Sequence, residues 1–361
     1  MKRPRVLLVF SSSELGGAER SLSRMALAAQ GTDYQLASLQ GEGPWCDWVR
    51  SLGHQPMLLG GAGFVTAIFR LVLQARRGRY DIVYVCGARA ALLLRLLRFM
   101  LPGIKLVHGV RWNPDSDSRL DRYFRPAERA TRLLMDGWIT NSAVAKKTLV
   151  GRCGIAREKI TVIHNGLDAV PASVSPLVAR PMEVLTVANL NPRKGHREYL
   201  QVMRDVLASC PGTRFVLVGR DDMNGAIQQA AAQAGLSEQV HFAGFAADVT
   251  PWYERARVFV LPSLWNEGCP TAILEAMAHA VPCVAYAIDG IPELVKSGEH
   301  GMLPAPDDQA GMTAAIIALL RDPEHAARLG RQGRERVARD FALERTASLH
   351  DAAFQRLLRQ R

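Results

Sequence analysis

Short runs of β-branched and other apolar residues alternate with longer amphipathic stretches along the whole chain. In the first half, three such runs are each followed by a stretch with helical periodicity. They are residues 5–10 (RVLLVF), 34–39 (YQLASL) and 81–86 (DIVYVC). The second half repeats the pattern, for example at residues 182–190 (MEVLTVANL) and 214–220 (RFVLVGR). Alternation of this kind predicts parallel sheets that are covered by helices on both faces. We therefore expect an α/β protein built from two doubly wound domains.

The chain length agrees with two domains, because 361 residues exceed one typical domain of about 150 residues. Residues 169–181 (AVPASVSPLVARP) are rich in Pro, Ala and Ser and lack a periodic apolar pattern, which is typical of a linker. The sequence thus predicts a first domain over residues 1–170 and a second from residue 171 onward. Ligands of open α/β sheets bind outside the carboxyl ends of the strands, so two such domains facing one another would enclose a central cleft.

The net charge of +11 is concentrated in the first half. Residues 1–175 contain 25 Lys and Arg against 13 Asp and Glu, whereas residues 176–361 contain 20 against 21. A basic surface attracts anionic lipid, nucleic acid or phosphorylated small molecules. The chain has no recognised nucleic-acid-binding module and no basic run interleaved with aromatic residues, so we do not expect a nucleic-acid partner.

The six cysteines show no CxxC spacing, which argues against a zinc site or a disulfide framework. We therefore expect reduced thiols, no bound metal and a cytoplasmic protein.

Two apolar segments of the first half, residues 64–79 and 88–101, are interrupted by arginines. The segment from Ala88 to Met100 is too short to span a bilayer and is broken by Arg95 and Arg98. Both segments are candidates for lying on an anionic membrane surface. The alternative is that they cover the sheet while their arginines extend into water.

Two features of the first domain suit a phosphorylated ligand. Gly16 and Gly17 follow the first predicted strand and precede a helix, where backbone N–H groups favour an anion. The alternative is a plain strand–helix turn. His108 is expected at the end of the strand KLVHGV, with Arg111 and Trp112 after it. A structural role is the alternative for a single histidine.

The loop after residues 182–190 carries the cations Arg193 and Lys194, followed by Gly195 and a helix. Two cations beside a helix N-terminus suit a diphosphate that gains negative charge as it leaves. The alternative is a pair of solvated surface charges. Asn189 lies at the start of the same loop.

The segment VFVLPSLWNEGCPTAILEAMA, residues 258–278, combines a strand, a glycine-containing turn and a helix start. It contains Glu267 and Glu275 with seven residues between them. Helix-start amides and carboxylates together can hold the hydroxyl groups of a sugar or a ribose. The spacing alone is weak support, whereas the whole strand–loop–helix string is informative.

Six motifs of this chain, taken in order, resemble those of family-4 retaining glycosyltransferases of the GT-B fold. They are GGAER, VHGVR, VIHNGLD, NPRKG, PSLWNEGCP with its two glutamates, and GIPELV. The resemblance covers nearly the whole chain and is densest over residues 184–305. It implies two Rossmann-like domains, with the donor held mainly by the second domain over residues 171–345. A final helix, residues 346–361, would return to the first domain, which faces the acceptor.

The resemblance also assigns roles in the second domain. Arg193 and Lys194 would bind the diphosphate of the donor, and Glu275 would bind the ribose. Many members have Gly-Arg where this chain has Ala188-Asn189, so Asn189 would contact the donor and Arg193 would replace the missing cation.

Glu267 would face the transferred sugar together with the backbone of Gly268, Cys269 and Pro270. From the first domain, His108 would reach the sugar. Gly16 and Gly17 would border the phosphates.

Many relatives have Gly-Gly where this chain has Asp289-Gly290. The local geometry of that loop is therefore expected to differ.

The resemblance implies metal-independent transfer of a hexose-type sugar, with retention of configuration, from a nucleotide diphosphate sugar; we favour a UDP-sugar. Fixed cations and helix-end amides would stabilise the leaving group without a cofactor. The expected acceptor is a saccharide or a lipid-linked saccharide in cell-envelope polysaccharide or lipopolysaccharide synthesis, at or near the cytoplasmic membrane face. The alternative is a non-catalytic protein that binds nucleotide sugars and serves assembly.

Overall fold

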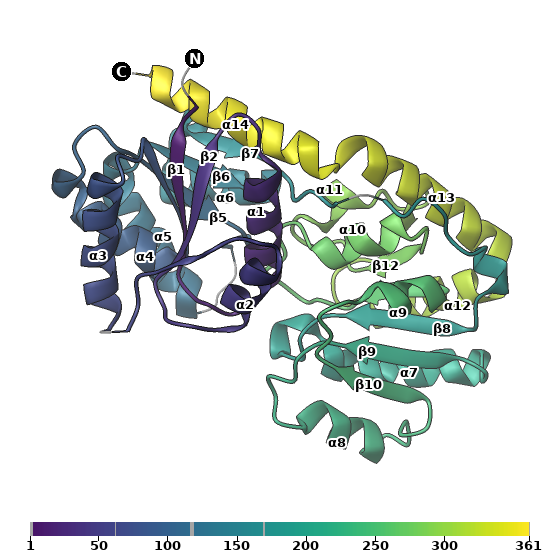
Figure 1. Cartoon of the computed structure of the whole chain (residues 1–361). Coiled ribbons are helices and arrows are strands. Elements are labelled where there is room, and N and C mark those ends of the chain that lie inside the picture. Colours follow the sequence, from purple (N-terminus) through teal and green to yellow (C-terminus); the bar gives the residue numbers. More distant parts are fainter. Residues whose placement is uncertain (1–2, 62, 116–118, 169, 361) are drawn as a thin grey trace. The chain divides into compact units, whose positions relative to one another are not determined.

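The computed structural model describes residues 3–61, 63–115, 119–168 and 170–360. These residues form two compact units, one made of residues 1–168 and 342–361 and the other of residues 169–341 (Figure 1). Ala169, the first residue of the predicted linker, and Arg361, the last residue of the predicted final helix, lie outside the described residues.

The N-terminal unit contains a seven-stranded parallel sheet with the order β3-β2-β1-β4-β5-β6-β7. Its strands are β1 (Arg5–Phe10), β2 (Asp33–Ser38), β3 (Met57–Leu58), β4 (Ile82–Cys86), β5 (Lys105–Val110), β6 (Gly137–Thr140) and β7 (Ile160–Val162). Its helices are α1 (Gly17–Ala28), α2 (Pro44–Ser51), α3 (Phe64–Arg77), α4 (Ala88–Leu96), α5 (Arg119–Thr131), α6 (Ala143–Cys153) and α14 (Leu343–Arg359), with the 3-10 turns η1 (Arg98–Met100), η2 (Arg132–Leu134) and η3 (Arg157–Lys159).

Alternation along β1 explains why both faces of this sheet are covered. Leu7 and Val9 pack with α3, α4 and α6 on one face. Val6, Leu8 and Phe10 pack with α1, α2 and α14 on the other. A central strand that is apolar and buried from Val6 to Phe10 therefore needs two helical layers, as parallel sheets do.

The last helix completes the core of the N-terminal unit. Phe354 of α14 is almost fully buried, and its ring lies 5.6 Å from that of Tyr84 on β4. Leu343 at the start of α14 donates its backbone N–H to the carbonyl of Leu167 over 2.8 Å. The polypeptide thus returns to this unit after it has formed the other one.

The C-terminal unit contains a six-stranded parallel sheet with the order β10-β9-β8-β11-β12-β13. Its strands are β8 (Glu183–Val187), β9 (Arg214–Val218), β10 (Val240–Gly244), β11 (Val258–Leu261), β12 (Cys283–Ala285) and β13 (Gly301–Met302). Its helices are α7 (His196–Ser209), α8 (Ala226–Gln233), α9 (Thr250–Arg255), α10 (Thr271–Ala278), α11 (Ile291–Leu294), α12 (Gln309–Arg321) and α13 (Pro323–Asp340), with the 3-10 turns η4 (Leu177–Ala179) and η5 (Pro192–Lys194).

The strand order reverses direction in both sheets, at β1/β4 and at β8/β11. Loops at such switch points carry the ligand sites of doubly wound folds. The prediction of two doubly wound parallel sheets is confirmed. Among the described residues, no helix has the length and apolarity needed to cross a bilayer.

Candidate donor site

The loop between β8 and α7 is held against the loop that follows β11. Gly195 has φ +66°, and a Cβ atom there would lie 2.2 Å from the carbonyl oxygen of Pro262. Only glycine fits this close approach of two backbones. The N–H of Leu264 donates to the carbonyl of Arg193 over 2.9 Å, which joins the same two loops. The cations of η5 are therefore placed at the switch point between β8 and β11.

Lys194 and Glu267 form an ion pair at this junction. The Nζ atom of Lys194 donates to Oε1 of Glu267, and the guanidinium of Arg193 lies 3.7 Å from the same oxygen. The side chains of Lys194 and Glu267 are 12% and 6% exposed, so the pair is largely withdrawn from water. The structure thus brings together three of the predicted site residues.

Burial and charge act in opposite directions on this pair. Burial lowers the pKa of Lys194, and Glu267 opposes that effect. Burial alone would raise the pKa of Glu267, but Lys194 and Arg193 outweigh it and hold that pKa below its usual value. Glu267 is therefore ionised at neutral pH and keeps the lysine ammonium in a fixed position.

The loop that carries Glu267 is also fixed from the side of β12. Oδ2 of Asp289 accepts the backbone N–H of Glu267 over 3.0 Å, and the N–H of Gly290 lies 3.3 Å from the Glu267 carbonyl. Asp289 adopts φ +46°, a left-handed conformation that aspartate tolerates better than most residues. The residue that departs from the family pattern therefore holds the backbone of a predicted site residue.

Gly268, Cys269 and Pro270 connect Glu267 to the N-terminus of α10. Pro270 is the N-cap residue, and its side chain makes no capping hydrogen bond. Cys269 is buried and fixes the turn from inside. The N-cap residue thus offers no side-chain acceptor to the first amides of α10, and it lies three residues after Glu267 in the chain.

Glu275 lies on the next turn of α10 and is partly buried. Its Oε2 accepts the hydroxyl of Tyr253 over 3.0 Å. Tyr253 is fully buried in α9, so it fixes one side of the carboxylate. Asn189 makes a different contact, because its Oδ1 accepts the backbone N–H of Arg220 over 3.1 Å.

Gly16 and Gly17 form the turn into α1, which begins at Gly17. The carboxylate of Glu19 accepts backbone N–H groups of Gly16 and of Glu19 itself. Burial raises the pKa of Glu19, while these hydrogen bonds act to lower it. A side chain of the protein therefore already contacts the amide of Gly16, one of the two that the sequence offers to a phosphate. Sequence analysis did not single out Glu19, although a glutamate two residues after Gly17 fits a cap of this kind.

His108 belongs to a buried charged network in the N-terminal unit. β5 continues to Val110, so the expectation that the strand ends at His108 is wrong. The imidazole is fully buried, and its Nδ1 lies 2.9 Å from Oε1 of Glu128 and 3.0 Å from the guanidinium of Arg95. Trp138 donates its indole N–H to the other Glu128 oxygen over 3.0 Å. The contact of His108 with a sugar stays a prediction.

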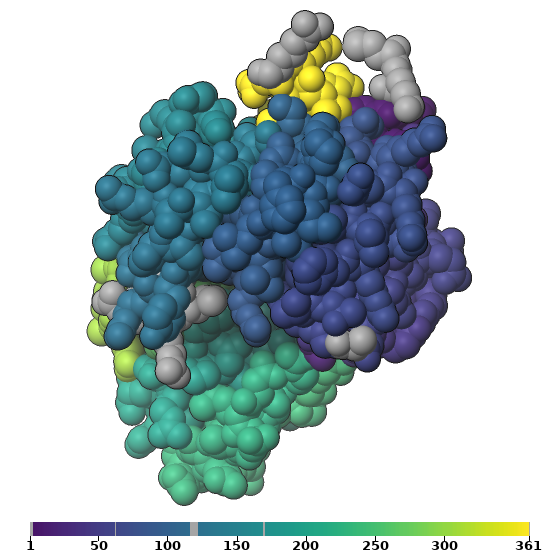
Figure 2. All heavy atoms as spheres, turned by 90° about the vertical axis from the view of Figure 1, so that its left-hand side faces the viewer, coloured from purple at the N-terminus to yellow at the C-terminus, as the bar shows by residue number. Residues whose placement is uncertain are grey.

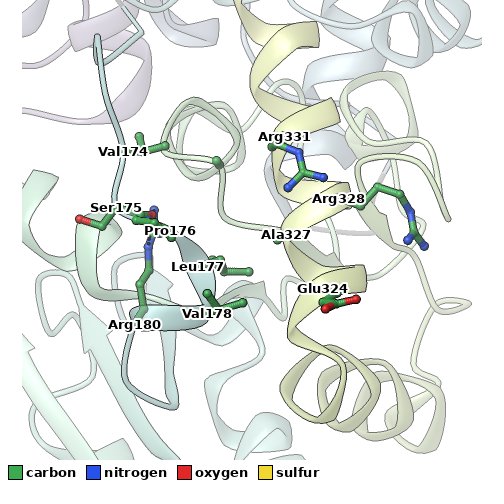
Figure 3. Close-up of a pocket in the computed structure, with 11 residues that line it drawn as sticks. Val174, Ser175, Pro176, Leu177, Val178, Arg180, Glu324, Ala327, Arg328 and Arg331 are labelled. Carbon is green, nitrogen blue, oxygen red and sulfur yellow. Dashed lines mark hydrogen bonds between the residues drawn. The ribbon is translucent and has the colours of Figure 1, made fainter.

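A separate cavity of about 550 Å³ lies in the C-terminal unit between η4 and α13 (Figure 3). Leu177 and Val178 border it on one side and Ala327 and Arg331 on the other. None of the predicted site residues lines it. This cavity is therefore distinct from the candidate donor site.

Buried Arg180 forms part of the wall of that cavity. It makes five hydrogen bonds to backbone carbonyls, two of them to Ser175 and the others to Tyr253, Ala256 and His279. Arg180 thus fastens the linker to the ends of α9 and α10.

Comparison with known proteins identifies the family of this chain. The family model described as Glycosyltransferase Family 4 matches residues 15–170, and the model described as Glycosyl transferases group 1 matches residues 181–322. The chain belongs to glycosyltransferase family 4. Together the two models cover both units.

Curated relatives of this family member act in several pathways. The chain is 30% identical over 200 residues to the putative colanic acid biosynthesis glycosyltransferase WcaL of Escherichia coli, which covers 53% of this chain and 49% of the relative. It is 31% identical over 220 residues to glycogen synthase of Mycobacterium tuberculosis, covering 59% and 52%. It is 30% identical over 174 residues to the lipopolysaccharide core biosynthesis mannosyltransferase LpsB of Rhizobium meliloti, covering 46% and 49%. The chain thus spans about half the length of the curated relatives it matches.

Solved structures show the same fold over the whole chain. Anabaena HepE in complex with UDP and glucose superposes with a TM-score of 0.84 at 21% identity, covering 98% of this chain and 100% of that one. The lipopolysaccharide outer core galactosyltransferase WaaB superposes with a TM-score of 0.72 at 15% identity, covering 98% and 99%. The fold of this family-4 member is the GT-B fold.

Proposed function

We propose that this protein transfers a hexose-type sugar from a nucleotide diphosphate sugar, with retention of configuration and without a metal. The observation that carries the proposal is the ion-paired Lys194 beside Arg193 and Glu267, where the loops after β8 and β11 meet. Breaking the bond between the sugar and the diphosphate builds negative charge on the leaving group. Cations that are already fixed stabilise that charge without having to reorganise during the reaction.

Each residue of the site has a defined task in this proposal. Lys194 and Arg193 bind the diphosphate, and Glu267 keeps both cations in place while its backbone leads to the sugar. The amides at the start of α10 add the positive end of a helix dipole. Glu275, with one oxygen held by Tyr253, binds the two ribose hydroxyls.

A UDP-sugar is the donor that we favour. Anabaena HepE, which shares the fold, has been solved with UDP and with UDP-glucose. The names of the relatives WcaL and LpsB support an acceptor in cell-envelope polysaccharide or lipopolysaccharide synthesis. We propose a saccharide or lipid-linked saccharide as acceptor on that basis.

An anionic membrane surface is the further partner that we propose. Val65, Phe69 and Leu73 recur every four residues along α3 and are 61%, 45% and 45% exposed. They form an apolar stripe that no described residue covers, and Arg70 and Arg76 beside it are exposed as well. α3 lies on the side of the N-terminal unit that faces the viewer in Figure 2. Apolar side chains flanked by arginines suit the interface of an anionic bilayer.

Calorimetric titration with UDP-, GDP- and ADP-sugars tests the donor proposal. We expect one nucleotide class to bind equally well with and without EDTA, and purified enzyme to hydrolyse that donor slowly. Binding without hydrolysis or transfer to any tested acceptor would favour the non-catalytic assembly role. Absence of binding by a folded sample would contradict the donor site itself.

The stereochemical part needs its own measurement. Proton NMR of the first product formed from an α-linked donor should show an α-linkage. A β-linked product would rule out retention, whatever the nucleotide.

A further inference from the structure

The N-terminal unit carries a cluster of arginines that the donor chemistry does not use. The helical sequence of α5 places Arg122, Arg125 and Arg129 three and four residues apart, and therefore on one face. Arg152 near the end of α6 joins them. These four side chains and Pro126 line one surface cavity of about 350 Å³, which we call the arginine basin.

Positive charge predominates among the described side chains of the basin. Among the described residues, Asp115 is the carboxylate that contacts it, at 2.7 Å from Arg152 and 3.4 Å from Arg125. Arg122 and Arg129 have no ion pair or side-chain hydrogen bond with any described residue. Among the side chains that the structure describes, four guanidinium groups therefore share one carboxylate.

Packing of the fold does not explain this arrangement. α5 is attached to its unit through Phe124 and Glu128, which are 5% and 2% exposed on the opposite side of the helix. Arg122 and Arg129 are exposed and add nothing to the core. Like charges three or four residues apart also destabilise a helix, by a few tenths of a kcal/mol per pair. A bound anion would reverse that cost.

Arginine in particular indicates the class of anion. The planar guanidinium donates two parallel hydrogen bonds to a phosphate, which an ammonium cannot do. We propose that the arginine basin binds a phosphate-type anion that is not part of the sugar donor. The proposal needs no activity at Lys194, so it stands apart from the proposed transfer reaction.

Such a phosphate has two sources, a lipid headgroup or a soluble phosphorylated ligand. Tyr123 on α5 is 68% exposed, and Leu133 on η2, just beyond the end of the helix, is 80% exposed. Exposed apolar side chains on the same helix–turn segment suit a bilayer surface. The chemistry of the basin is the same for either source.

The test compares two probes in two charge-reversal variants. The probes are inorganic pyrophosphate, followed by calorimetry, and phosphatidylglycerol vesicles, followed by co-sedimentation at low salt. All proteins carry Lys194→Ala, so that the candidate donor site contributes little to anion binding. Arg122→Glu/Arg129→Glu reverses the charges of two exposed arginines of the basin. Arg204→Glu/Arg214→Glu makes the same charge change at two exposed arginines of the C-terminal unit.

We expect the basin variant to bind at least one probe about tenfold or more weakly, because each basic residue near an anionic surface contributes about fivefold. Weaker binding to vesicles alone identifies a lipid headgroup, and weaker binding to pyrophosphate alone identifies a soluble ligand. Unchanged binding of both probes, or an equal loss in the control variant, overturns the proposal. If circular dichroism shows that the basin variant is unfolded, Arg122→Gln/Arg129→Gln takes its place with the same outcomes.

Discussion

The ammonium group of Lys194 contacts the carboxylate of Glu267, although the two residues are 73 positions apart in the chain. Two βα loops, one after β8 and one after β11, supply the two partners. Each loop is held by its own backbone contact, at Gly195 and at Asp289. The candidate donor site is therefore organised before any ligand binds.

Lys194→Ala should lower turnover by about 10²–10³-fold while the protein stays folded, because one fixed donor to the developing charge is lost. Steady-state kinetics with the donor found by calorimetry measures this. Arg204→Ala, an exposed arginine of α7, is the control and should behave as the wild type. Near-normal turnover in the Lys194 variant would remove this residue from the mechanism.

Asp289 should affect donor affinity through its negative charge and turnover through its hydrogen bond to the backbone of Glu267. Asp289→Asn keeps an oxygen that accepts the Glu267 N–H but removes a negative charge near the diphosphate, so we expect the affinity for UDP to rise about threefold. Asp289→Gly restores the common family residue but removes the contact, and turnover should fall about tenfold as Glu267 loses its position. Calorimetry and kinetics on both variants separate the two effects. Weaker UDP binding by the asparagine variant would contradict the charge argument.

The buried Arg95–Glu128 pair should stabilise the N-terminal unit only as a pair. The two groups lie 2.6 Å apart and are 1% and 2% exposed. Burial raises the pKa of Glu128, but His108 and Arg95 prevail and hold it at about 2. Glu128→Leu leaves a buried cation and should cost about 3–5 kcal/mol, whereas Arg95→Met/Glu128→Leu should cost less than that single change. Urea unfolding of the two variants checks this, and a double variant less stable than Glu128→Leu would refute it.

His350 should make the N-terminal unit sensitive to mild acid. Its ring is fully buried, and burial lowers its pKa to about 3. As the pH falls below about 6.5, His350 becomes protonated in the unfolded chain but stays neutral in the folded state. The free energy of unfolding therefore decreases between pH 6.5 and pH 3. From pH 7 to pH 5 this one group accounts for about 2 kcal/mol. His350→Gln should flatten the decline of the unfolding free energy over that range, and an unchanged slope would assign it to other groups.

Arg180 should stabilise the C-terminal unit through its hydrogen bonds rather than through its charge. Arg180→Met removes five hydrogen bonds and leaves buried carbonyls at the ends of α9 and α10 unpaired. Each unpaired buried group costs about 1–3 kcal/mol, so we expect a loss of at least about 3 kcal/mol in the C-terminal unit. Arg328→Met, at an exposed arginine bordering the same cavity, should change stability by less than about 0.5 kcal/mol. Similar melting temperatures for both variants would refute the distinction.

Local sequence patterns predicted the two parallel sheets and the part of the candidate donor site that contains Lys194 and Glu267. The continuous apolar run at residues 6–10 indicated a buried strand, and the position of Lys194 and Glu267 after two strands indicated that they meet at one edge of a sheet. Periodicity did not predict which partner Asp289 would hold, because that contact depends on how two separate loops pack.

His108 shows the limit of reading a strand end from sequence. The strand runs on to Val110, and the imidazole turns into the core toward Arg95 and Glu128. These partners come from two different helices, and nothing in their local sequence marks them as a network. Glu19 differs from His108, because its position near the start of α1 is typical of a residue that caps a helix.

The return of α14 to the N-terminal unit has a consequence for biosynthesis. Val6, Leu8 and Tyr84 leave the ribosome long before Phe354, which packs with them. This unit therefore cannot close its core until α14 has followed the whole C-terminal unit out of the ribosome. A nascent or truncated chain that ends before Leu343 exposes an apolar face of the sheet to chaperones and proteases.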